Sequence, residues 1–80
     1  MTAEETKKRL TEIFIDIFND NSIVLTRQTT AADIDDWDSL AQISLVVAIE
    51  KEFKIQLELG ELKALQNVGD MLDVIERKAS

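Results

Sequence analysis

Apolar residues recur at helical spacing in three stretches of this 80-residue chain, and the chain contains no proline that could interrupt them. In the first stretch the apolar side chains follow the pattern i, i+3, i+4, i+7, i+8: Leu10, Ile13, Phe14, Ile17 and Phe18. This spacing is typical of an amphipathic helix that buries one face. It predicts a first helix over about residues 3–18, which ends where Asn19 and Asp20 favour a turn.

A second helix is expected over about residues 39–53. Asp38 or Ser39 can cap its start, because both side chains can accept a hydrogen bond from a free N–H of the first turn. Ser39 and Gln42 also stand at the spacing of a capping box. The sequence therefore predicts a well-defined start for this helix, with two candidate caps.

A shorter leucine pattern and a final amphipathic pattern complete the helices. The leucines that predict a brief third helix are Leu59, Leu62 and Leu65. Asn67 is a suitable N-cap for a last helix that ends near Lys78. The sequence thus predicts an all-α fold, with three main helices and one short helix packed as a four-helix bundle in a single domain over residues 1–80.

Between the first two predicted helices, from Asn19 to Trp37, the chain keeps no helical period. A connection of this length is uncommon in so small a domain and is usually functional. We expect an ordered loop whose Leu25, Ile34 and Trp37 side chains pack against the core.

The second predicted helix is apolar on two sides. At about 100° per residue, one side collects four core candidates: Leu45, Val46, Ile49 and Phe53. The other side carries Leu40, Ile43 and Val47. One helix of a small bundle cannot easily bury both sides. We expect Leu40 to pack beneath the loop, and Ile43 and Val47 to stay exposed as a contact surface for a partner.

The composition excludes several classes of protein. Without cysteine or histidine the chain has no disulfide, no thiol nucleophile and no imidazole base. A net charge of −7 would repel nucleic acid and anionic membranes. No apolar run approaches the ~18 residues that span a bilayer, and no signal-peptide core follows the basic residues near the start. We expect a cytoplasmic protein that does not insert into membranes.

Four aspartates cluster before the second predicted helix: Asp33, Asp35, Asp36 and Asp38. Such a cluster could suggest carboxylate catalysis or a metal site. The calcium-loop template fails, because Trp37 and Ser44 fall at ligand positions and Asp38 falls at the glycine position. We expect a solvated, turn-favouring surface, with no metal site and no enzyme activity.

Ser39 lies where this acidic segment leads into the most apolar predicted helix. It is not a conventional catalytic nucleophile, because the chain has no histidine to activate it. It could simply cap the helix. A helix N-terminus is also a good seat for a phosphodiester, since free N–H groups and the positive end of the helix dipole lie there. Ser39 is therefore a candidate for covalent attachment of a phosphate group.

Several motifs together resemble those of acyl carrier proteins, the phosphopantetheine-attachment domains of fatty acid, polyketide and related pathways. D-S-L opens the apolar helix at residues 38–40, and E-K-E-F ends it at residues 50–53. The pattern I-x-L…L…L-x-N-V-x-D-x-L follows over residues 55–72. The similarity covers nearly the whole chain.

The resemblance implies that a phosphopantetheinyl transferase attaches 4′-phosphopantetheine from coenzyme A to Ser39. The thiol of this arm would carry an acyl group as a thioester. Asp38 would flank the phosphate, and Leu40 would anchor the helix start. The family's partner-contact positions fall on Ile43, Val47 and Glu50. The implied partners are acyl-loading, condensing or acyl-transferring enzymes with basic or apolar docking patches, and a mobile shuttle of this kind is expected to be a monomer.

The chain departs from typical carriers of fatty acid synthesis at two places. Asp36 and Trp37 stand where those carriers have a glycine, and Ala41, Ser44 and Lys51 stand where acids are frequent. We therefore expect a carrier of a specialised pathway rather than of housekeeping fatty acid synthesis. Two alternatives stay open: an aminoacyl or peptidyl carrier, and an unmodified acidic helical module that binds a basic protein.

Overall fold

The computed structural model describes residues 2–79, and in this part of the chain the regular structure is entirely helical. The elements in chain order are α1 (Ala3–Phe18), the 3-10 helix η1 (Ala31–Asp33), α2 (Ser39–Phe53), α3 (Leu59–Lys63) and α4 (Val68–Ala79). The predicted all-α bundle of three main helices and one short helix is confirmed. The two ends of the predicted domain, residues 1 and 80, lie outside the described residues.

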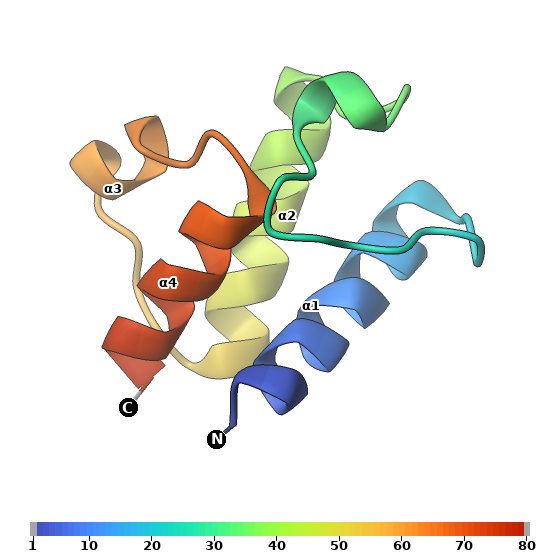
Figure 1. Ribbon diagram of the computed structural model, residues 1–80. Coiled ribbons are helices and arrows are strands. Elements are labelled where there is room, and N and C mark those ends of the chain that lie inside the picture. Colours follow the sequence, from blue (N-terminus) through green and yellow to red (C-terminus); the bar gives the residue numbers. More distant parts are fainter. Residues whose placement is uncertain (1, 80) are drawn as a thin grey trace.

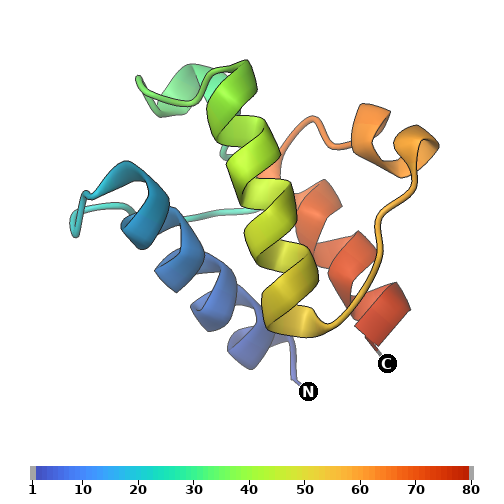
Figure 2. The same ribbon diagram turned by 180° about the vertical axis from the view of Figure 1, so that it is seen from behind.

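The three main helices run alongside one another, and α2 lies in front of α1 and α4 in Figure 2. The start of α2 lies at the opposite end of the bundle from the start of α1 and the end of α4 (Figure 1). The Cα radius of gyration is 11.5 Å, close to the ~11.6 Å expected for a single domain of this length. Within residues 2–79, no helix is both long and apolar enough to cross a membrane.

The core forms where α1 packs against α2 and α4. Its most deeply buried apolar side chains come from all three main helices and from the loop after α1: Leu10, Phe14, Leu25, Leu45, Ile49, Val68, Met71 and Ile75. The predicted core side of α2 is confirmed at Leu45, Ile49 and Phe53, while Val46 is only half-buried at its edge. The apolar stripes read from the sequence therefore meet in one core.

The loop between α1 and α2 is ordered because it is tied to both the core and α4. Leu25 is completely buried, and Ile34 is half-buried against the core. The N–H of Val68 donates to the carbonyl oxygen of Thr29 at 2.9 Å. The N–H of Gly69 donates to the carbonyl of Arg27 at 3.0 Å, and a Cβ on Gly69 would lie 3.0 Å from that same oxygen. The glycine thus permits this close approach of the two backbones.

Helix η1 is a feature of this loop that helical periodicity did not predict. Its three residues are held by a capping box, in which Thr30 Oγ1 accepts from the Ala32 N–H at 3.2 Å and the Thr30 N–H donates to Asp33 Oδ2 at 2.9 Å. Three residues are too few to show a period. The Thr-x-x-Asp spacing was the available signal for this turn.

A charged cluster joins α3 to α4. The carboxylate of Glu61 accepts from the Glu58 N–H, from Lys78 Nζ and from Arg77 Nη2, each at 2.9 Å. These contacts favour the ionised carboxylate and lower the pKa of Glu61 from its ordinary 4.5 to about 2, with the backbone hydrogen bond from Glu58 as the largest cause. Protonation of Glu61 should therefore weaken the contacts that join α3 to α4.

Replacing Leu72 by alanine should lower the free energy of unfolding by ~2–5 kcal/mol, because Leu72 is only 6% exposed and the deletion leaves a cavity. The matched control is Leu59→Ala, whose side chain is 69% exposed and should change stability by less than ~0.5 kcal/mol. Urea denaturation measures both variants. Equal effects would contradict the assignment of Leu72 to the core.

Stability should also fall in acid partly through Glu61. Its folded-state pKa is depressed, so its contribution is present above its ordinary pKa of 4.5 and is lost as the pH falls through about 2. Glu61→Gln should therefore flatten the decline of melting temperature between these pH values. Glu12→Gln, at an exposed position on α1, is the control and should leave the wild-type slope. An unchanged slope in Glu61→Gln would show that the cluster does not form in solution.

Candidate functional site: the serine at the start of α2

Asp38 is the residue that caps α2, and Ser39 is the first residue inside the helix. The carboxylate Oδ1 of Asp38 accepts from the Ala41 N–H at 2.8 Å, and the backbone of Asp38 is extended. The predicted capping box between Ser39 and Gln42 is wrong. The adjacent aspartate occupies the capping position, and the Gln42 side chain is used elsewhere.

Ser39 is left with an exposed and uncommitted hydroxyl. Within residues 2–79, its Oγ makes no hydrogen bond to the protein, and neither do the N–H groups of Ser39 and Leu40. Free N–H groups in the first turn, together with the positive end of the helix dipole, favour a negatively charged oxygen close to this point. The chemistry of this site therefore fits a phosphodiester on Ser39.

Trp37 holds the segment before Ser39 against the bundle. Its side chain is 9% exposed, and its ring meets Phe14 edge-on, with centroids 5.2 Å apart and an interplanar angle of 84°. Its indole N–H donates to Gln42 Oε1 at 2.6 Å, so the one polar atom of the ring is satisfied by a residue of the first turns of α2. The expected packing of Trp37 against the core is confirmed.

Leu40 does not pack beneath the loop: its side chain is 75% exposed. The expectation that it anchors the helix start is wrong. The loop buries Leu25 and Trp37 in the core instead, whereas Leu40 lies on the exposed side of α2. Ile43 and Val47 lie on that same side and are 61% and 46% exposed, as expected. These three residues, Leu40, Ile43 and Val47, form the outward stripe of α2.

A shallow groove separates the outward stripe from α3. It has a volume of about 190 Å³ and an apolar wall, and its lining residues are Gln42, Ile43, Val46, Val47 and Leu62. Leu59 extends the apolar surface on α3 and is 69% exposed. Apart from Val24 on the loop, the exposed large apolar side chains of residues 2–79 lie on α2 and α3, beginning at the residue after Ser39.

Glu50, the third predicted partner-contact residue, also has a role within the fold. Its Oε2 accepts from the N–H of Leu57 at 2.9 Å, which ties the last turn of α2 to the segment that precedes α3. The side chain is half-buried. This contact joins residues seven apart across a turn, and no local sequence pattern indicates it.

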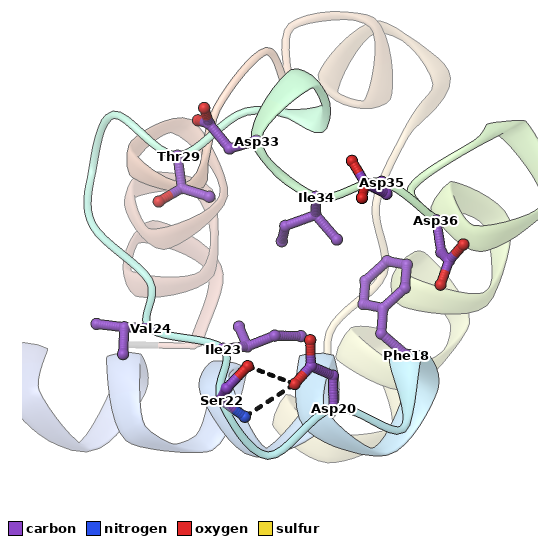
Figure 3. Close-up of a pocket in the computed structure, with 10 residues that line it drawn as sticks. All are labelled: Phe18, Asp20, Ser22, Ile23, Val24, Thr29, Asp33, Ile34, Asp35 and Asp36. Atoms are coloured by element: carbon purple, nitrogen blue, oxygen red, sulfur yellow. Dashed lines mark hydrogen bonds between the residues drawn. The ribbon is translucent and has the colours of Figure 1, made fainter.

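The acidic segment borders a second hollow, of about 360 Å³, shown in Figure 3. Its apolar wall is formed by Phe18, Ile23 and Ile34, and its acids are Asp20, Asp33, Asp35 and Asp36. Asp20 Oδ1 accepts from Ser22 Oγ at 2.6 Å and from the Ser22 N–H at 2.9 Å, and these bonds lower the pKa of Asp20.

The acids of this segment act separately. Asp33 accepts from the Thr30 N–H within the capping box of η1, and Asp38 caps α2. Among the described residues, no three acidic side chains lie close enough together to hold a metal ion.

Comparison with known proteins gives a consistent result. Residues 8–75 match the family model described as "Phosphopantetheine attachment site". The chain belongs to the acyl carrier proteins.

Individual relatives agree with this family. The chain is 27% identical over 73 residues to an acyl carrier protein of Porphyromonas gingivalis, covering 91% of this chain and 94% of the relative. It is 28% identical over 78 residues to an acyl carrier protein of Petrotoga mobilis, covering 98% and 92%. The solution NMR structure of a holo acyl carrier protein from Geobacter metallireducens is 52% identical, with a TM-score of 0.87, over 91% of this chain and 84% of that chain.

Membership of the family confirms three predictions made from the sequence: the carrier class, the four-helix carrier fold, and a covalently attached 4′-phosphopantetheine as the cofactor. It also confirms that the chain is a carrier rather than an enzyme. A carrier acts by presenting its cargo to other proteins, so its partners include a phosphopantetheinyl transferase and biosynthetic enzymes.

The hydrogen bond between Trp37 and Gln42 should appear as a coupling in a double-mutant cycle. Trp37→Phe removes the donor, Gln42→Met removes the acceptor at similar volume, and the coupling energy from urea denaturation should be about 1 kcal/mol. The same cycle with Gln56→Met, at an exposed position outside this contact, should give no coupling. No coupling between Trp37 and Gln42 would mean that the indole does not bond to this side chain in solution.

Proposed function

We propose that the protein carries acyl groups as thioesters on a 4′-phosphopantetheine arm attached to Ser39, and delivers them between enzymes of a biosynthetic pathway. The observation that carries the proposal is the state of Ser39 itself. Its hydroxyl is exposed and free of hydrogen bonds within residues 2–79, because Asp38 performs the capping that a serine at this position could otherwise provide. The serine stands in D-S-L inside the region that matches the family model.

Attachment requires a substitution at phosphorus. The Oγ of Ser39 forms a bond to the phosphorus of the phosphopantetheine moiety of coenzyme A, the bond to the adenosine-bearing phosphate breaks, and that part leaves with the electron pair. The Oγ–H proton must pass to a base. The chain has no histidine, and the carboxylate of its neighbour Asp38 is engaged with the Ala41 N–H. We assign the base to the transferase.

The residues around Ser39 have distinct parts in this proposal. Asp38 fixes the first turn, so that the N–H groups of Ser39 and Leu40 remain available to the attached phosphate. Leu40 lies beside the phosphate as an exposed apolar contact rather than as an anchor. Ile43 and Val47 contact partner enzymes along α2, and Glu50 borders that surface while it holds Leu57.

The proposed pathway is a specialised one rather than housekeeping fatty acid synthesis. From Ser39 to Ile49, α2 contains no charged side chain. The first charged residues after this stretch are Glu50 and the basic residue Lys51. This surface offers few ion-pair partners to an enzyme with a basic docking patch. It supports a partner set with more apolar docking surfaces.

The test is the intact mass of the protein after incubation with coenzyme A and a promiscuous phosphopantetheinyl transferase. The wild type should gain one phosphopantetheine and Ser39→Ala should gain none. Ser44→Ala is the matched control, since Ser44 is also exposed on α2, and it should be modified like the wild type. A folded wild-type protein that stays unmodified, while a control carrier is modified, would overturn the proposal.

A further inference from the structure

Gln42 links the tryptophan before Ser39 to the groove between α2 and α3. Its side-chain oxygen Oε1 accepts from the indole N–H of Trp37 at 2.6 Å. The same side chain lines the groove, and of the described residues that do so it alone is polar. The others are Ile43, Val46, Val47 and Leu62. The polar group of the groove is therefore held by a residue that does not line it.

The bond to Trp37 fixes the direction in which the carboxamide of Gln42 points. An indole N–H can only donate, so the Gln42 oxygen faces the ring and the –NH2 group faces away from it. Within residues 2–79, Nε2 of Gln42 donates to no protein atom. The side chain is half-buried, and among these residues no buried side-chain nitrogen or oxygen lacks a partner. Nε2 is thus an oriented donor that is open to a ligand.

This donor lies next to the point where the arm begins. Gln42 follows Ser39 by three residues, and side chains at this spacing are neighbours on a helix, with Cβ atoms ~5–6 Å apart. The arm runs from its phosphate through a segment with methyl groups and a hydroxyl to an amide carbonyl. The phosphate has free N–H groups at the helix end, and moving its charge between apolar walls would cost free energy. The neutral amide carbonyl is therefore the better partner for Nε2.

We propose, resting on the attachment of the arm to Ser39, that Gln42 is a positioning residue whose Nε2 donates to the amide carbonyl of the arm nearest the phosphate. Trp37 acts through Gln42, because the indole sets the orientation of the carboxamide. The bond holds the first part of the arm beside α2. A partner enzyme that draws the arm into its own active site has to break this bond or replace it.

The side-chain amide protons of Gln42 report this bond in NMR spectra of isotope-labelled protein. Attachment of the arm should slow their hydrogen exchange about fivefold, the factor that a hydrogen bond of ordinary net strength gives. Gln56 is the matched control, because its side chain is exposed outside the site, and its exchange should change less than about twofold. Equal slowing at both residues, in protein that mass spectrometry shows to be fully modified, would overturn the proposal.

Gln42→Glu separates the donor from its support. The substitution keeps an oxygen for the Trp37 N–H and replaces the donor by a second oxygen. It should leave the indole protected and move the carbon NMR signal of the arm's first amide carbonyl upfield. Ser44→Glu adds the same charge at an exposed position of α2 and should leave this signal in place. A signal that Gln42→Glu does not move would assign Nε2 to another partner, the phosphate included, and would overturn the proposal.

Trp37→Phe tests the orienting role of the indole. The substitution removes the donor to Oε1 and leaves the Gln42 side chain intact. Because the carboxamide is then free to turn, the slowing of its exchange on attachment of the arm should fall to about twofold or less. Wild-type slowing in this variant, with the fold retained by circular dichroism, would show that Gln42 does not need Trp37 and would overturn the proposal.

Failure of the positioning role and failure of the proposed function give different results. A folded wild type that gains no phosphopantetheine overturns the attachment at Ser39. A fully modified wild type whose Gln42 amide exchanges as fast as in the unmodified protein overturns only the role of Gln42.

Discussion

The burial of Trp37 against Phe14 fixes the end of the long loop and, with it, the start of α2. The ring lies edge-on to Phe14, and its N–H donates a hydrogen bond to the side chain of Gln42 near the start of α2. The residues between Trp37 and Gln42 have little conformational freedom, because Trp37 is held in the core and Gln42 is held in the helix. A polar indole atom left without a partner in this position would cost free energy, so the hydrogen bond to Gln42 makes the buried position of the ring possible.

Three consecutive residues then serve three different purposes. Trp37 points into the bundle, Asp38 satisfies the Ala41 N–H, and Ser39 faces solvent with a free hydroxyl. An aspartate at the capping position stabilises a helix by about 1 kcal/mol relative to alanine. A serine one position further on can therefore be modified without removing a cap on which the helix depends. The free first-turn N–H groups suit the phosphate that the family attaches.

Much of this arrangement could be predicted from the sequence, and the errors have physical causes. The helices and their core follow from apolar periodicity, which is strong in Leu10, Ile13 and Phe14 and their equivalents in α2 and α4. The sequence did not decide between Asp38 and Ser39 as the cap, because both are good caps and the choice depends on how Trp37 directs the chain. Leu40 was expected to be buried because it is a leucine beside a loop, but the loop residues buried in the core are Leu25 and Trp37, and Leu40 lies on the exposed side of α2. The contact between Glu50 and Leu57 depends on the path of the chain after α2, which periodicity does not describe.

The anchoring of Trp37 positions the segment before Ser39, and one NMR measurement tests this anchoring. The chain has a single tryptophan, so its indole N–H gives one resonance whose hydrogen exchange can be followed alone. This N–H should be protected from exchange, and it should stay protected after modification, because the arm leaves from Ser39 on the solvent side of α2 while the indole is bonded to Gln42. Exchange as fast as that of a free indole in water, before or after modification, would show that the segment before Ser39 is not held against the bundle.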